Sequence, residues 1–308
     1  MSVVLITGGS GFIGGHLCRH LMYEGYKVIN YDLSDTLRAN IHVHGDIMDL
    51  GRLRSTIDYY KADYVFHLAG VSNTGECITD PYRAMEINCG GTINVLQSCV
   101  DSRHTVKRVF LAGSSLVSSV MGLNLAENGT IIDDPRHLDL DRYGHVYTTT
   151  KIFLEMIAKN YFMMHELPFT ILRFGICYGP AMTSGVLVHN FLDNVLLKKE
   201  PMYIHGDGSQ QRYYMHVKDL VNGCVMSMVP QAENKTFYLI PKWITTVNDI
   251  AYEIQRQIGG EIKHVEKRSH DFHINKAFPE NDFGWEASIG LKEGLEDTIN
   301  WYKGCYGL

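Results

Sequence analysis

Short apolar runs alternate with segments of helical periodicity along the first part of the chain. The apolar runs predict strands at Val3–Thr7, Lys27–Tyr31, Ile41–His44, Tyr64–Leu68, Arg108–Ala112 and Phe169–Phe174. Apolar positions at helical spacing predict helices at Phe12–Tyr23, Leu50–Tyr60, Ala84–Cys99 and Tyr147–Met164. Buried strands that alternate with helices are typical of a parallel sheet covered on both faces. The sequence therefore predicts an α/β fold with a doubly wound parallel sheet of the Rossmann type.

Beyond Pro180 the hydrophobic pattern becomes less regular. It predicts helices at Val186–Lys198, Lys218–Met228, Val247–Ile258 and Leu291–Tyr302, and strands at Tyr213–Val217 and Phe237–Ile240. Residues Thr246–Asp249 resemble a capping box with Asp in place of Glu. We find no repeat and no flexible linker, so we expect a first domain over residues 1–180, to which the chain returns around residues 213–245. Residues 181–308 would form mainly a smaller C-terminal α/β region.

The composition argues against several classes of function. The formal net charge of −6 and the scattered basic residues give no support to nucleic-acid binding. No uninterrupted apolar stretch is long enough to span a membrane, and no signal peptide is evident. The seven cysteines include no CxxC pair, which favours reduced thiols and no metal site. We therefore expect a cytoplasmic protein without membrane or nucleic-acid partners.

Three glycines, Gly8, Gly11 and Gly14, follow the first strand and open the first helix. In this context the backbone N–H groups and the positive end of the helix can face an anion, here a pyrophosphate. Asp32 ends the second strand, where its carboxylate can hold both hydroxyls of a ribose and would repel a 2′-phosphate. The sequence therefore favours NAD over NADP. The alternative is a glycine turn without a ligand.

Tyr147 and Lys151 stand four residues apart at the start of a predicted helix and so share one face. A free phenol has a pKa near ~10, and an adjacent ammonium together with a positive nicotinamide would lower it. Such a tyrosine can exchange a proton with a sugar hydroxyl while the cofactor exchanges a hydride. Ser114, at the end of the fifth strand, could hydrogen-bond the same oxygen, with Ser115 as the competing hydroxyl. A surface pair on a helix is the alternative for YxxxK, and a hydroxyl that merely ends a strand is the alternative for Ser114.

The order of these motifs resembles the extended short-chain dehydrogenase/reductase family, in particular its NAD-dependent nucleotide-sugar epimerases and dehydratases. The resemblance covers nearly the whole chain and includes TGGSGFIG, Gly45-Asp46-Ile47, His67-Leu68-Ala69-Gly70, NCGGT from Asn88, Tyr178-Gly179-Pro180 and GDGSQQRYYMHVKD. With the residues already named, it implies cofactor contacts from Gly8, Gly11, Phe12, Ile13, Gly14, Asp32, Asp46, Ile47, Leu68, Ala69, Gly70, Asn88, Tyr147 and Lys151.

The resemblance also implies a nucleoside diphosphate sugar as the substrate, bound mainly by the C-terminal region. Arg212 and Arg268 would bind its phosphates, because a planar guanidinium suits bidentate phosphate contacts. Further substrate contacts are implied for Ser115, Asn190 and Asp271. Surface ion pairs are the alternative for each arginine. In relatives the helices at Ala84–Cys99 and Tyr147–Met164 pair across a twofold axis, so we expect a homodimer, the alternative being a purely internal role.

Departures from the family pattern narrow the expected reaction. Dehydratases of the family carry Asp-Glu after the catalytic hydroxyl residue and decarboxylases carry Glu at the second of these positions, whereas this chain has Ser115-Leu116. The resemblance then leaves an NAD-dependent 4-epimerase, similar to UDP-glucose 4-epimerases, that acts through a transient 4-keto sugar. A 4-ketosugar reductase is the alternative, favoured by Gly113-Ser114-Ser115, and a cofactor-sensing regulator without turnover is the third hypothesis. Val117-Ser118-Ser119 and Ile176 depart from the family near the sugar pocket, and we expect residues 127–141 to form a loop over the sugar.

Overall fold

The computed structural model describes residues 1–35, 39–119, 121–125, 131–138, 146–266, 281 and 283–308. Its centre is a seven-stranded parallel sheet with the strand order β13-β8-β5-β4-β1-β2-β3. The strands are β1 (Val3–Thr7), β2 (Lys27–Asp32), β3 (Ile41–His44), β4 (Tyr64–His67), β5 (Arg108–Ser114), β8 (Phe169–Phe174) and β13 (Lys235–Leu239). The predicted α/β fold with a doubly wound parallel sheet is thus confirmed.

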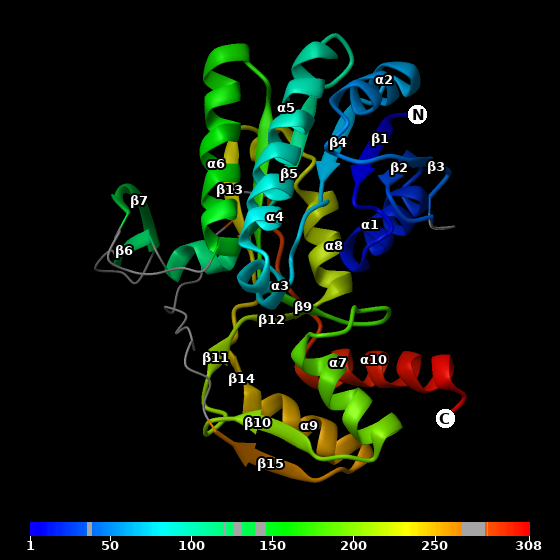
Figure 1. Cartoon of the computed structure of the whole chain (residues 1–308), viewed down its shortest axis with the longest axis vertical. Helices are drawn as coiled ribbons and strands as arrows, with labels where there is room; N and C mark the ends of the chain where they lie inside the picture. The colour runs from blue at the N-terminus through cyan, green and yellow to red at the C-terminus, as the bar shows by residue number, and fades with distance from the viewer. Residues whose placement is uncertain (36–38, 120, 126–130, 139–145, 267–280, 282) are drawn as a thin grey trace.

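Helices cover both faces of the sheet because alternate strand residues point to opposite sides. In β1, Leu5 joins the core under α2 (Leu50–Tyr60), α5 (Gly91–Asp101) and α6 (Val146–His165). Its neighbours Val4 and Ile6 join the opposite core under α1 (Phe12–Tyr23) and α8 (Val217–Met226). Figure 1 shows these two helix layers on either side of the strands.

The helix predicted at Ala84–Cys99 is longer and less regular than its pattern indicates. It begins as α4 (Pro81–Met85), widens into a π-helical turn at Glu86–Gly90, and continues as α5. A further short helix, α3 (Thr74–Thr79), precedes it. A π-turn arises from backbone hydrogen bonds and leaves little trace in the hydrophobic period, and such turns are frequent at functional sites.

The C-terminal region packs around a core of its own, drawn below the sheet in Figure 1. Its helices are α7 (Leu187–Leu192), continued by a π-turn (Asp193–Lys198), α9 (Val247–Ile258) and α10 (Leu291–Tyr306). Its strand pairs are β9 (Ile176–Tyr178) with β12 (Tyr214–His216), β10 (Met202–His205) with β15 (Ile262–Val265), and β11 (Gln211–Arg212) with β14 (Thr245–Thr246). The capping box at Thr246 and Asp249 is present at the start of α9.

The segment between β12 and β14 belongs to both parts of the molecule. Helix α8 packs beside α1, a 3₁₀ turn follows at Pro230–Ala232, and β13 then pairs with β8 along the edge of the main sheet. Asp219 at the start of α8 accepts hydrogen bonds from the backbone of Ser288 and Ile289 and so fixes the segment that leads into α10. The two parts are therefore interleaved, whereas the domain boundaries at residues 180 and 181 stay a prediction.

A short hairpin stands where the sequence predicted only a loop. After the 3₁₀ turn Ser115–Ser119, β6 (Met121–Leu125) pairs antiparallel with β7 (Ile131–Leu138). The loop expected over residues 127–141 is thus wrong for residues 131–138, which form β7 and pair with β6. No helix in the described part of the chain is long and apolar enough to cross a membrane.

Candidate functional site

The glycine turn between β1 and α1 owes its shape largely to the protein's own backbone. A Cβ on Gly14 would lie 2.1 Å from the carbonyl oxygen of Gly8, and one on Gly8 would lie 2.6 Å from the backbone nitrogen of Ala69. Gly8 also has φ +77°, a left-handed conformation that favours glycine. Gly11 is exposed, and Phe12 and Ile13 open α1 behind it. The turn therefore leaves the first amides of α1 facing outward, as an anion site requires.

Asp32 lies at the carboxyl end of β2, beside this turn. Its Oδ2 accepts a hydrogen bond from the backbone of Ser10 at 3.0 Å and its Oδ1 accepts one from the backbone of Ser34 at 2.9 Å. Each carboxylate oxygen keeps a further lone pair for a ligand hydroxyl. The carboxylate is thus fixed in orientation next to the glycine turn, the geometry that a ribose-binding residue needs.

The predicted adenine-side residues lie between the end of β3 and the start of α2. Asp46 is exposed and accepts a hydrogen bond from the backbone of Met48 through Oδ1. Ile47 is buried, and its Cδ1 would lie 2.3 Å from a Cβ placed on Gly91. Ile47 therefore packs inward against α5 while Asp46 faces outward.

The loop after β4 carries Leu68, Ala69 and Gly70 and is held by Asn88. The Asn88 side chain accepts a hydrogen bond from the Val71 backbone at 2.7 Å and donates one back to the Val71 carbonyl at 3.0 Å. It also donates to the Thr150 hydroxyl on α6 at 3.1 Å. Asn88 thus ties this loop to α6. A direct cofactor contact from Asn88 stays a prediction.

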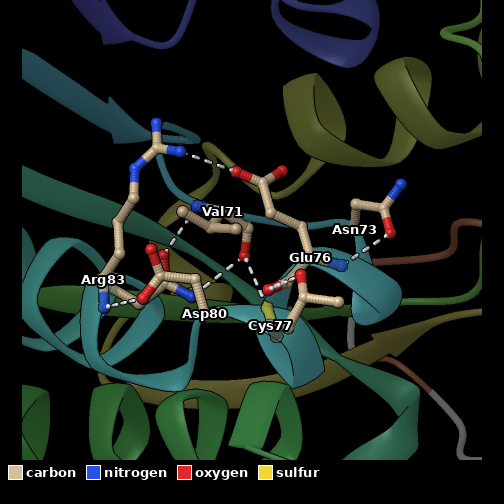
Figure 2. A network of polar contacts seen from close by, with 8 residues as sticks. Val71, Asn73, Glu76, Cys77, Asp80 and Arg83 are labelled. Carbon is tan, nitrogen blue, oxygen red and sulfur yellow. Dashed lines mark hydrogen bonds and ion pairs between the residues drawn. The ribbon is translucent and has the colours of Figure 1, made fainter.

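Figure 2 shows the contacts between α3 and Val71 of the same loop. Asn73 caps α3 through its side-chain oxygen, and Cys77 donates from its thiol to the Val71 carbonyl at 3.6 Å. Glu76 and Arg83 form an exposed ion pair at 3.1 Å that links α3 to α4. Cys77 is fully buried, and its charge would act on both Tyr147 and Lys151.

Tyr147, Lys151 and Ser114 meet at the carboxyl edge of the sheet. The Lys151 ammonium donates to the Ala112 carbonyl at 2.8 Å and lies 5.6 Å from the centroid of the Tyr147 ring. Ser114 ends β5 with only 5% exposure, and its Oγ also accepts from the Leu116 backbone at 3.3 Å. The predicted phenol, ammonium and hydroxyl are thus brought into one cluster.

Burial dominates the ionisation of this cluster. It raises the pKa of Tyr147 to about 12, while the hydrogen bond with Ser114 acts in the opposite direction. Burial lowers the pKa of Lys151 to about 8, opposed by Cys77 where its thiol is ionised and by the Glu155 carboxylate. In the protein groups on their own, desolvation of the phenolate keeps the Tyr147 pKa above its ordinary value, and the lowering expected from Lys151 together with a nicotinamide stays a prediction.

The predicted substrate residues are less concentrated. Ser115 is buried beside Ser114, and its carbonyl accepts a hydrogen bond from the Ser118 hydroxyl. Asn190 is exposed on α7, and Arg212 is half-buried on β11, both in the C-terminal region. Arg268 and Asp271 lie outside the described residues.

Sequence reasoning missed two groups that the fold places around Lys151. Thr150 joins Asn88 to the Tyr147 carbonyl, which its hydroxyl contacts at 2.8 Å. His67 is buried between Thr7 and Thr92, with ring-nitrogen to hydroxyl distances of 2.8 and 3.1 Å. A further cluster of Asp35, His42 and His44 brings its potential ligand atoms within 4.8 Å of one another, but Asp35 and His42 pair directly at 2.8 Å, and we assign this cluster no metal.

A model of the NAD dependent epimerase/dehydratase family matches residues 4–240, and the chain belongs to this family. It is 28% identical to a putative UDP-glucose 4-epimerase of Methanocaldococcus jannaschii, covering 98% of both chains. It is also 28% identical to UDP-glucuronic acid decarboxylase 1 of Xenopus tropicalis, over 97% of this chain and 72% of the other. The structure of MoeE5 in complex with UDP-glucose and NAD matches with a TM-score of 0.85 at 27% identity, over 99% of this chain and 100% of the other.

NAD is the cofactor of this family, and the site fits it. The glycine turn would leave helix amides open to a pyrophosphate, and Asp32 beside it presents two carboxylate oxygens fixed by backbone contacts that would hold a ribose. Tyr147 and Lys151 stand at the other end of the same sheet edge, beyond β4 and on α6. The chain thus belongs to a class of NAD-dependent proteins that modify nucleotide sugars.

Proposed function

We propose that the protein is a nucleotide-sugar 4-epimerase. The observation that carries the proposal is the cluster of Ser114, Tyr147 and Lys151 at the sheet edge that also bears the glycine turn. The absence of a carboxylate at Ser115-Leu116 supports epimerisation over dehydration and decarboxylation, for which relatives carry an acid there. Bound NAD supplies reversible hydride exchange at carbon 4 of the sugar.

The chain's own residues would supply the proton chemistry. Tyr147 removes the proton of the sugar 4-hydroxyl and returns it after the 4-keto sugar has rotated, while Ser114 orients that oxygen. Lys151 provides a positive charge beside the phenol ring, and this charge, with that of a bound nicotinamide, would favour phenolate. The same ammonium would hold the nicotinamide ribose, as the family resemblance implies.

We infer a UDP-sugar as the substrate class to test first. Support comes from the relatives named above, one named as a putative UDP-glucose 4-epimerase and one solved in complex with UDP-glucose, and from Arg212, whose guanidinium suits a diphosphate. Asn190 on α7 stands in the C-terminal region that would close over the nucleotide. Arg268 and Asp271 remain proposed contacts on the same grounds as in the sequence.

The deciding experiment is an assay on purified protein with UDP-glucose, UDP-galactose and UDP-glucuronate, followed by proton NMR. We expect one of these sugars to convert to its C4 epimer with no added NADH or NADPH. The reaction should approach the same ratio of epimers from either direction, because it consumes nothing. Release of water or carbon dioxide would contradict the proposal.

A 4-ketosugar reductase is the second candidate, favoured by the adjacent hydroxyls of Ser114 and Ser115. Such an enzyme consumes reduced cofactor mole for mole, so absorbance at 340 nm distinguishes it from an epimerase. Mass spectrometry of copurified ligands would identify the nucleotide directly for either candidate.

We also propose that the protein forms a homodimer through α5 and α6, which lie side by side in Figure 1. The support is exposed apolar surface: Ile93 is 37% exposed, and Met156, Met163 and Met164 are 56%, 80% and 62% exposed. Leu96, by contrast, is fully buried in the sheet core. The proposed interface thus uses only part of the apolar circumference of each helix.

A further inference from the structure

A buried ion pair lies one helical turn beyond Lys151. The side chains of Glu155 on α6 and Arg173 on β8 are only 3% and 2% exposed. The Arg173 Nε and Nη2 donate to the two Glu155 carboxylate oxygens, each at 2.8 Å. Nη1 donates to the Tyr238 hydroxyl on β13 at 2.8 Å, and the guanidinium lies 4.8 Å from the centroid of that ring. Both carboxylate oxygens are thus engaged by one fork-shaped donor.

Stability alone gives little reason for this pair. The cost of removing two charges from water is large, and apolar residues of similar volume are often as stabilising. Its position is more informative, because Lys151 and Glu155 stand at i and i+4 on α6. A lysine and a glutamate at this spacing face each other on a helix and form ion pairs. Without another partner, the Glu155 carboxylate would attract the Lys151 ammonium.

The observed ammonium points elsewhere. Lys151 donates to the Ala112 carbonyl and stands over the Tyr147 ring rather than along the helix toward Glu155. Strand β8 places Arg173 close to this site, because Arg173 is in register with Gly113 of β5. A Cβ on Gly113 would lie 3.3 Å from the Arg173 side chain, so a glycine there leaves room for the guanidinium stem.

Two other titratable groups face Lys151 from neighbouring elements. Burial lowers the pKa of His67 on β4 to about 3 and raises the pKa of the Cys77 thiol on α3. Both are therefore neutral at pH 7. Among the described groups that act on the Lys151 pKa, Glu155 is then the one that carries a full charge at this pH.

We propose that Arg173 is a positioning residue that captures the Glu155 carboxylate and so leaves the Lys151 ammonium directed at Ala112 and Tyr147. The catalytic consequence rests on the function proposed for Lys151, whereas the arrangement itself does not depend on turnover. Tyr238 extends it to β13, which the chain reaches only after passing through the C-terminal region.

The test is a pH titration of Lys151 by NMR in protein labelled with ¹³C at the lysine ε-carbon. The Lys151 resonance is identified by its loss in Lys151→Met. In Arg173→Met the freed carboxylate should pair with Lys151 and raise its pKa by about one pH unit or more. Glu155→Gln removes the carboxylate charge that raises the Lys151 pKa and leaves the guanidinium charge in place, so the pKa of Lys151 should fall. We therefore expect the Lys151 pKa to shift in opposite directions in Arg173→Met and Glu155→Gln.

The double variant Glu155→Gln/Arg173→Met is the matched control. It removes both charges, which buried sites often tolerate, and the pKa of Lys151 should return close to the wild-type value. If Arg173→Met does not fold, Arg173→Lys replaces it, because a point charge cannot hold both carboxylate oxygens and should raise the pKa in the same direction by less. An unchanged pKa in the Arg173 variants, or a change in the same direction as in Glu155→Gln, would overturn the proposal. None of these readouts uses a substrate, so failure of the epimerase proposal would leave the result intact.

Discussion

The ammonium of Lys151 donates a hydrogen bond to the carbonyl oxygen of Ala112 at 2.8 Å, and this contact joins α6 to β5. Ala112 is two residues before Ser114, and Lys151 is one turn after Tyr147. The contact therefore fixes the position of the Tyr147 side chain on α6 relative to the Ser114 hydroxyl on β5. It does not involve the phenol oxygen, so chemistry and architecture at this site can be separated by substitution.

Tyr147→Phe removes one oxygen and leaves the ring packing almost unchanged. If the phenol relays the proton, kcat should fall by roughly 10²–10⁴-fold, with little change in NAD affinity. The measurement is steady-state kinetics on the substrate identified by the NMR assay, together with calorimetry for NAD. Tyr161→Phe is the matched control, since its hydroxyl on the same helix contacts Gln97 instead. Near-normal turnover would direct attention to Tyr143, which lies outside the described residues.

Lys151→Met should slow the reaction and also weaken NAD binding. The wild-type rate should decline as the pH rises through about 8, because the depressed pKa of Lys151 means that its charge is lost there. The variant should lack this decline. Its rate should instead rise with pH over the range in which the protein stays folded, since the Tyr147 pKa of about 12 lies above it. Parallel pH profiles for wild type and variant would contradict the role of the ammonium.

Asp32 should determine the choice between cofactors. Its fixed carboxylate would repel a 2′-phosphate, so calorimetry should show far tighter binding of NAD than of NADP. Asp32→Asn removes the charge, keeps the size, and should narrow the difference. Asp35→Asn serves as the control, because this side chain is 88% exposed, and it should leave the difference in affinity between NAD and NADP unchanged. Equal affinities of the wild-type protein for the two cofactors would refute the assignment.

His67 should make the protein sensitive to acid. Burial, and secondarily the Lys151 charge, lowers the pKa of His67 from 6.5 to about 3. Between these values the unfolded chain binds a proton that the native state does not, so stability falls as the pH drops below 6.5. The slope from one such group is at most about 1.4 kcal/mol per pH unit.

The acid dependence can be checked by urea unfolding between pH 4 and 7 in three proteins. His67→Gln keeps a donor and an acceptor near Thr7 and Thr92 and should flatten the curve. His104→Gln, at a 69% exposed side chain, should leave it as in the wild type. If the stability of His67→Gln fell with decreasing pH as steeply as that of the wild type, His67 would be ruled out as the cause of the acid sensitivity.

The dimer proposal predicts twice the monomer mass by light scattering at micromolar concentration. Ile93→Glu combined with Met156→Glu should give a monomer, because both side chains are exposed on the helices proposed to pair. Tyr59→Glu on α2, at a residue that is 79% exposed, should remain dimeric. A monomer mass for the wild-type protein under these conditions would contradict the homodimer proposal.

The sequence revealed those parts of the fold that have a strong hydrophobic period. The bounds predicted for β1, β3, β8, α1 and α2 coincide with those in the structure. The two residues of β11 are too few to show an alternation, and both β11 and β15 pair with strands far along the chain. The π-turn at Glu86–Gly90 depends on backbone hydrogen bonds, which the apolar pattern does not report.

The residues of the candidate site also divide into those that a local sequence pattern reveals and those that only the fold brings together. Gly8, Asp32 and Tyr147 stand at positions that a strand–turn–helix pattern marks in advance, so sequence reasoning reaches them. Thr150 and Glu155 resemble ordinary helix residues until the fold sets them against Asn88 and Arg173. Contacts between segments this far apart, and the burial that raises the Tyr147 pKa, exist only in the assembled core.

The position of β13 also bears on how the chain folds while it is being synthesised. Because β13 covers the outer edge of β8, a nascent chain that has completed β8 exposes an unpaired strand until residues 235–239 emerge from the ribosome. At ~5–20 residues per second this interval lasts several seconds. A chain cut after residue 180 would keep that edge permanently open. Aggregation, rather than a free cofactor-binding half, is the expected product of such a truncation.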